Sequence, residues 1–460
     1  MSQNVLIILL VNFLFYAKTL RMGYVSDDIV SAQRSPHKNP FLHWFWVLEG
    51  HSKSVSYKKM EQGDSNFLMP GVDHAITTLL HSLVCVGIYL GLGDNQVSFI
   101  AALLFSFNPV NNQGSVWISG RGYVLSALGM VWALALPMEM GGLMLLGATY
   151  SNAGFSLPII LLGSSHPYLF IFAPLCWWFH MKRFQKNVKQ KMDMELFTED
   201  KHIHPKKLIL AVKTFGIYLS HAIIPFKTTF YHSYLESIAG CNAQKAYTLC
   251  KFFWFGAGSL VLMLWYICTH RWDMVCFGIL WWCVGIAPFC NLMRMQQELG
   301  ERYVYAANVG AMLILAHFIS PYPVVCAFFI GMYAMKTWDF ISGYKDDFWF
   351  IEVCRINQPK SWFAWHISAV KRWDVQSYRE AVIFWVMAKN LSPKEFKLLF
   401  NLAAALVVMG NQCVEPLRSN MIREGLGFLA EAEKNIPKGQ EKMAGEFITN
   451  FRNNKVAILI

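Results

Sequence analysis

Long apolar runs recur through the first three quarters of the chain, and this feature limits the fold more than any other. Residues 4–17, 257–268 and 322–336 approach or reach the roughly 20 apolar residues that cross the core of a bilayer. Of the 460 residues, 55% are hydrophobic and only 15% are charged, whereas an ordinary soluble domain has about 25% charged residues. The sequence therefore predicts an all-α, polytopic bundle of membrane helices.

Hydropathy predicts about eleven membrane spans, two of which are short. They lie near residues 4–20, 74–92, 97–107, 115–137, 140–150, 155–180, 208–225, 251–269, 274–290, 303–319 and 322–338. An odd number of spans puts the two ends of the chain on opposite sides of the membrane.

Basic residues in the connectors predict the orientation of these spans. The connector 182–207 carries eight Lys or Arg residues, and the positive-inside rule makes it cytosolic. The first loop (21–73) and residues 339–460 then lie on the other side. Lys18 and Arg21, which follow the first span, favour the reverse orientation by themselves.

The chain changes character near residue 345, where charge rises and no later run is long enough to span a membrane. We therefore predict two domains: a multi-span membrane domain over 1–344, which contains the long loop 21–73, and a soluble helical domain over 345–460. Six residues of the second domain match the offsets of a tetratricopeptide unit of about 34 residues: Trp365, Ala369, Ala381, Trp385, Ala388 and Pro393. A generic pair of helical hairpins is the alternative.

Charge and cysteine usage exclude some functions. The net charge is +11, but the basic residues sit in connectors and a tail and form no single stripe, so we do not expect nucleic acid as a partner. The cysteines contain no Cys-x-x-Cys pair, so no metal site is predicted. The sequence leaves open whether a divalent metal is needed.

Two adjacent acids, Asp27 and Asp28, follow the first span at the start of the long loop. Long loops at a membrane face usually carry function, and a carboxylate at this depth could deprotonate an acceptor hydroxyl beside a lipid-borne donor. The alternative is that the pair caps a helix beginning at Ile29.

The same loop brings together groups that suit a phosphate. Lys58 is a candidate phosphate ligand, and His51 and Tyr57 are candidate supporting residues. An ordinary solvated surface is the alternative for all three.

Arginines also occur within or beside apolar spans, where an ionisable side chain is costly and normally pairs or lines a polar cavity. Arg121 and Arg302 are candidates to clamp a phosphate or diphosphate, with Glu301 and Tyr303 as supporting residues. The alternative is an internal pair, either Glu301 with Arg302 or an Asp–Arg pair.

Several segments resemble motifs of one family, and they occur in the same order. YVSDDIV (24–30) is similar to the family's first-loop acidic motif, residues 54–60 to SHKSYRPL, and residues 72–83 to FHLVNVLLHAL. SGRGYVL (119–125) is similar to a Gly-Arg motif, residues 224–225 to a short Pro connector, and ERYVYAANVG (301–310) to ERYLYLPSVG. Together they resemble the transmembrane O-mannosyltransferase family with tetratricopeptide repeats, in the GT-C class of multi-span glycosyltransferases.

The chain also departs from that family's pattern. Where the family has HPVHTEAV, this chain has neutral residues from Asn108 to Val116, among them Asn111, Asn112 and Gln113. Ser151 and Asn152 stand where the family has a Lys-Glu pair. These exchanges either adapt the site to another sugar or acceptor, or mark a protein that binds without catalysing.

The resemblance implies an inverting enzyme that moves a sugar, expected to be mannose, from a polyprenyl or dolichyl phosphate to Ser or Thr hydroxyls of a protein. It implies that the acidic motif is catalytic and that the repeats lie on the luminal side. The expected partners are the lipid-phosphate sugar, membrane lipid, and a protein acceptor or partner at the helical domain. The expected location is the endoplasmic reticulum membrane in a eukaryote or the inner membrane in a bacterium. A non-enzymatic membrane scaffold is the main alternative, and a transporter is disfavoured because the spans show no internal repeat.

Overall fold

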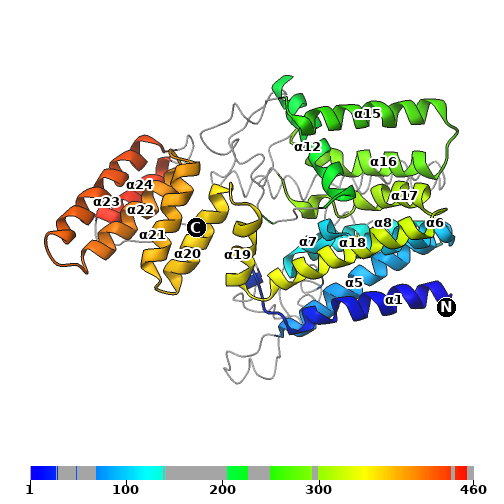
Figure 1. Ribbon diagram of the computed structural model, residues 1–460, viewed down its shortest axis with the longest axis horizontal. Coiled ribbons are helices and arrows are strands. Elements are labelled where there is room, and N and C mark those ends of the chain that lie inside the picture. The colour runs from blue at the N-terminus through cyan, green and yellow to red at the C-terminus, as the bar shows by residue number, and fades with distance from the viewer. Residues whose placement is uncertain are drawn as a thin grey trace. The chain divides into compact units, whose positions relative to one another are not determined.

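The computed structural model of the protein consists of helices and their connections throughout the part of the chain it describes, and contains no strand there. The described residues are 2–26, 28–29, 48, 69–137, 140, 205–225, 230, 249–292, 299–436 and 441–452. The chain divides into two compact units, and the last division along the sequence falls between Phe350 and Ile351. In the first unit, the long helices lie alongside one another with their axes roughly aligned (Figure 1).

Among the described residues of the first unit, five helices are long and apolar enough to cross a membrane. They are α1 (Gln3–Tyr16) with its extension to Arg21, α5 (Pro70–Gly91), α8 (Arg121–Ala135) with the turn that precedes it, α15 (Lys251–Thr269), and α18 (Pro323–Ile341) with its extension to Tyr344. The chain is thus a membrane protein whose described part is all-helical, as the hydropathy predicts. The total of about eleven spans stays a prediction, and the spans expected at 140–150 and 155–180 lie outside the described residues apart from residue 140.

Shorter apolar helices complete the described part of the first unit. These are α6 (Gln96–Phe107), α16 (Met274–Ile286) and α17 (Asn308–Ile319), together with the longer α12 (Pro205–Ile223). The helix α6 packs on α5 and α17, and α16 packs on α17. A capping box starts α6, because the Asn95 side chain accepts from the Ser98 N–H and the Ser98 hydroxyl lies 3.0 Å from the Asn95 nitrogen.

Glycines let pairs of these helices approach closely, as is common between helices in membranes. Gly87 and Gly91 of α5 lie against Val131 of α8, so a Cβ at either glycine would collide with α8. A Cβ on Gly256 of α15 would strike the carbonyl of Val212 on α12, and one on Gly216 would strike the carbonyl of Phe252. Backbone contact, rather than interlocking side chains, therefore brings α12 and α15 together.

Gly216→Ala and Gly256→Ala are each expected to destabilise the protein by about 1–3 kcal/mol, because the new methyl group has no space. Gly258→Ala is the matched control on the same helix, since a Cβ at that position would have no atom of another described element within 4 Å. Thermal melting of the purified protein measures the difference. Equal melting temperatures for the Gly256 and Gly258 variants would contradict the close crossing.

A buried polar network joins α1, α5 and α6 to the turn that contains Tyr305. The Nε2 atom of His81 lies 3.2 Å from the carbonyl of Ser106, and its Nδ1 atom lies 2.6 Å from the Tyr305 hydroxyl. A carbonyl only accepts, so Nε2 carries the proton and Nδ1 accepts from Tyr305. Tyr16 also donates to the Ser106 carbonyl at 2.7 Å. His81 thereby fixes the turn that follows Arg302.

The second unit contains α20 (Trp362–Asp374), α21 (Tyr378–Leu391), α22 (Phe396–Gly410), α23 (Leu417–Lys434) and α24 (Glu441–Arg452). The helix α19 (Asp347–Asn357) runs into it from the first unit. One apolar cluster gathers Ala369, Ala381, Trp385 and Ala388 with three residues of α22, and a second gathers α22 with α23 and α24. Four of the six residues singled out by the repeat pattern are thus buried together, Trp365 packs against them while partly buried, and Pro393 is exposed. The tetratricopeptide assignment stays a prediction.

Glu352, at the start of this unit, forms salt bridges with two arginines, Arg355 and Arg372. Its two carboxylate oxygens accept from Arg355 at 2.8 Å and from Arg372 at 2.7 Å. Burial alone would raise the pKa of Glu352, but the hydrogen bonds and charges of Arg355 and Arg372 outweigh burial and lower that pKa below its usual value.

Stability is therefore expected to depend on pH through Glu352. Because the folded pKa lies below the unfolded one, the carboxylate stabilises the fold above its unfolded pKa, and this contribution is lost as the pH falls through the folded value. Melting temperature measured from pH 7 downward should fall more steeply for the parent than for Glu352→Gln. The control Glu433→Gln, which breaks the more exposed pair with Arg452, should keep the parent slope. The prediction fails if the melting temperature of Glu352→Gln falls with pH as steeply as that of the parent.

Candidate functional site

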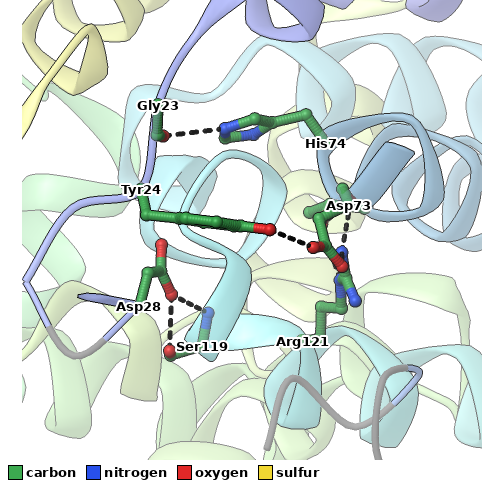
Figure 2. A network of polar contacts seen from close by, with 8 residues as sticks. Gly23, Tyr24, Asp28, Asp73, His74, Ser119 and Arg121 are labelled. Atoms are coloured by element: carbon green, nitrogen blue, oxygen red, sulfur yellow. Dashed lines mark hydrogen bonds and ion pairs between the residues drawn. The ribbon is translucent and has the colours of Figure 1, made fainter. Parts of the chain in front are cut away.

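The acidic segment after the first span is bonded to a turn 91 residues later in the chain. Asp28 is fully buried, and its Oδ1 atom accepts from the Ser119 N–H at 2.9 Å and from the Ser119 hydroxyl at 2.5 Å (Figure 2). Ser119 belongs to the short 3-10 turn Ile118–Gly120 that leads into α8. The carboxylate thus reaches another element, whereas the alternative drawn from the sequence was a local helix cap.

Tyr24 of the same segment points at a buried ion pair (Figure 2). Its hydroxyl donates to Asp73 Oδ2 at 2.8 Å, and Asp73 Oδ1 lies 3.0 Å from Arg121 Nη2. The Arg121 guanidinium also donates to the Asp73 carbonyl and, through Nε, to the Thr77 hydroxyl at 2.8 Å. Burial and the Asp73 carboxylate raise the pKa of Tyr24 well above its usual value, so the phenol remains a donor.

Arg302 lies in a different environment from Arg121. Its guanidinium carbon is 4.8 Å from the Tyr303 ring centroid, 5.4 Å from Phe230 and 5.6 Å from Trp117. Its exposed fraction is only 8%, and within the described part of the chain no carboxylate forms an ion pair with it. Its Nη2 atom donates to the Tyr303 hydroxyl at 3.3 Å, whereas the Nη1 atom and the nearby indole Nε1 of Trp117 have no hydrogen-bond partner among the described residues.

A single segment, residues 113–121, connects these two groups of side chains. Gln113 Oε1 accepts from the Arg302 backbone N–H at 3.2 Å. Trp117 contacts the Arg302 guanidinium, Ser119 binds Asp28, and Arg121 pairs with Asp73. Trp117 and Ser119 are two positions apart, so their Cα atoms are at most about 7 Å apart. The buried Asp28 and the buried Arg302, which forms no ion pair with a carboxylate in the described ranges, therefore attach to neighbouring points of one turn.

The residues predicted from the sequence have different outcomes. Asp28, Arg121, Glu301, Arg302 and Tyr303 are all buried in the first unit. Asp27, His51, Tyr57 and Lys58 lie outside the described residues. Arg121 forms the internal Asp–Arg pair that the sequence left open as an alternative, and no ion pair joins Glu301 to Arg302 in the described region.

Sequence reasoning missed two members of the network, Asp73 and Tyr24. Asp73 lies in the first turn of α5, a helix that contains no other Asp, Glu, Lys or Arg, and the cost of such a residue at membrane depth was a usable signal. Tyr24 stands in the acidic motif itself. Its pairing with a residue 49 positions away has no local signature.

Three of the neutral residues in the segment that departs from the family motif, Asn108, Asn111 and Gln113, form internal bonds. Asn108 donates to the carbonyl of Ala222 at 2.7 Å, and Asn111 donates to that of Phe105 at 2.7 Å and accepts from Asn308 at 3.1 Å. Gln113 in addition accepts from the Arg302 backbone N–H. Through these amides, the segment that begins at Asn108 is joined to α12, α6, α17 and the residues just before α17. Among the described residues, no group of three or more His, Cys, Asp or Glu side chains could hold a metal ion.

Comparison with known proteins gives one partial similarity. The chain is 28% identical over 138 residues to Protein O-mannosyl-transferase TMTC1 of Mus musculus. The match covers 25% of this chain and only 14% of the mouse protein. No protein-family model matches the chain, and no solved structure matches it. The similarity suggests an O-mannosyltransferase-like membrane protein.

Proposed function

We propose that the protein is a glycosyltransferase that moves a sugar from a polyprenyl or dolichyl phosphate to Ser or Thr hydroxyls of a protein acceptor. The resemblance of the ordered motifs and the partial similarity to the mouse transferase support mannose as the sugar. The proposed reaction takes place on the luminal side of the endoplasmic reticulum membrane in a eukaryote, or on the periplasmic side of the inner membrane in a bacterium.

The observation that carries the proposal is the environment of Arg302. A buried cation without a carboxylate partner is costly, and none is found for Arg302 in the described part of the chain. There the Nη1 atom of Arg302 and the indole Nε1 of Trp117 are also donors without acceptors. A phosphate offers the missing negative charge and several acceptor oxygens, and an arginine fork suits its geometry. We therefore assign the donor phosphate to Arg302, with Tyr303 and Lys58 as supporting candidates.

Arg121 has a different role in this proposal. Its charge is offset by Asp73 in a pair whose side chains are both fully buried, so it supports the scaffold around Tyr24 and Thr77. We keep phosphate binding for Arg302 and treat Arg121 as the residue that holds α5 and α8 in register beside the site.

The proposed step is a direct displacement at the anomeric carbon. Asp27 or Asp28 takes the proton of the acceptor hydroxyl as its oxygen attacks that carbon. The bond from the carbon to the phosphate oxygen breaks, and the lipid phosphate leaves with the electron pair. Arg302 stabilises the charge that builds on the leaving phosphate, which is the kind of preorganised interaction that usually contributes most to such rates.

Transfer of labelled mannose from a polyprenyl phosphate to a Ser- or Thr-containing acceptor, by the purified full-length protein, tests the proposal. The double variant Asp27→Asn/Asp28→Asn is the matched control, since Asn keeps the size of both side chains. We expect transfer by the parent and a loss of about a hundredfold or more in the control. Equal transfer by both proteins would show that another group is the base.

A membrane scaffold that binds a protein partner through its C-terminal helices is the second candidate. The internal bonds of Asn108, Asn111 and Gln113 favour it, because residues at charged positions of the family motif are here used to join helices. Absence of transfer from any polyprenyl phosphate sugar by the folded parent, together with capture of a partner by the full chain, would favour the scaffold.

A further inference from the structure

The connector that follows the last span α18 is bonded to the acidic segment at the start of the chain. The Gly23 N–H donates to the Lys345 carbonyl at 3.1 Å. The Ser26 N–H donates to Asp347 Oδ1 at 2.6 Å. All four residues belong to the first unit, so the contact lies within one compact body.

Ser26 has an unusual backbone that needs such support. Its φ angle is +53°, in the left-handed region that residues with a Cβ rarely adopt. A strained residue of this kind persists when its surroundings fix it. The hydrogen bond from its N–H to the Asp347 carboxylate is charge-assisted, which makes it stronger than a bond to a neutral acceptor. The backbone at Ser26, two residues before Asp28, is therefore fixed from outside the segment.

We infer that Asp347 is a positioning residue for the acidic segment of the proposed transferase. It lies at the first position of α19, and it acts through Ser26 rather than on the substrate. Asp347 precedes the division between Phe350 and Ile351, so the contact that fixes Ser26 lies entirely within the first unit. The inference rests on the proposed function only for its effect on turnover.

Hydrogen exchange at the Ser26 amide of the full-length protein tests the contact. In Asp347→Ala the exchange rate at this amide is expected to rise about tenfold or more, because a partly buried donor loses its charged acceptor. Asp347→Asn keeps an acceptor oxygen without the charge, so its exchange rate should lie between parent and Ala variant. Parent-like exchange in both variants would overturn the inference.

Asp346→Ala is the matched control at the neighbouring position. It removes the same charge, but the bond that it breaks is local, from the Trp349 N–H to Asp346 Oδ1 at 2.8 Å. Exchange at Ser26 should stay at the parent rate. If Asp346→Ala raises that rate as much as Asp347→Ala does, a general loosening of α19 accounts for the effect, and the specific contact is rejected.

Turnover separates the positioning role from a merely structural one. Asp347→Ala should lower kcat about tenfold while the affinity for the lipid-linked sugar and the melting temperature stay close to the parent. Faster exchange at Ser26 with unchanged kcat would reject the positioning role. A parent without any transfer activity would reject the proposed function instead, and the exchange data would still decide whether Asp347 fixes the segment.

Discussion

Turnover of the Asp27→Asn variant is expected to fall about a hundredfold or more, which is the usual effect of losing a general base. Asp28 is already engaged by the N–H and hydroxyl of Ser119, so we favour the adjacent Asp27 as the group that takes the proton. Asp28→Asn should cause a smaller loss, because the amide oxygen can still accept from Ser119. Donor affinity and melting temperature of both variants should stay near the parent values.

Rates of sugar transfer with saturating lipid-linked donor measure this difference. If Asp28→Asn has the larger effect, the roles of the two acids are reversed. If both variants transfer sugar at the parent rate, the base is a different residue.

Arg302→Ala is expected to weaken binding of the lipid-phosphate sugar by about tenfold to a hundredfold, the range for losing one charge-assisted hydrogen bond to a buried group. Arg302→Lys should have a smaller effect, since it keeps the charge but loses the planar fork. Arg271→Ala is the control, because Arg271 is exposed between α15 and α16.

Binding of a labelled polyprenyl phosphate sugar to the protein in lipid vesicles measures these affinities. Parent-like affinity in both Arg302 variants would mean that Arg302 serves only to pack the rings of Trp117, Phe230 and Tyr303. That result would remove the main support for a phosphate at this position.

Hydropathy was enough to locate the long helices. The runs near 4–20, 74–92 and 251–269 correspond to α1 with its extension, α5 and α15, because helix formation in lipid is forced by the need to satisfy every backbone group within the segment. The start of α8 was harder to predict. The residues before Arg121 form short turns rather than one continuous span, since the polar run from Asn108 to Ser115 bonds to other helices.

The partners of the charged side chains could not be read from the sequence. By hydropathy, Arg121 and Arg302 are equally costly to place in an apolar span. Only the packing of α5 on α8 shows that Arg121 pairs with Asp73. Arg302 is instead surrounded by aromatic rings. Arg121 and Asp73 are 48 positions apart, so their pairing depends on helix packing, which a local sequence pattern does not encode. The sequence therefore supported an internal ion pair and a phosphate ligand equally for each arginine.

The bond between Ser26 and Asp347 also bears on how the protein is made. The two residues are 321 positions apart, and a ribosome adds about 5–20 residues per second, so roughly 15 to 65 seconds separate their synthesis. During that interval the acidic segment has left the ribosome without the carboxylate that fixes Ser26. The segment can reach its final geometry only after the last span has emerged, so a nascent chain that stalls before residue 347 carries both acids without the contact that orders them.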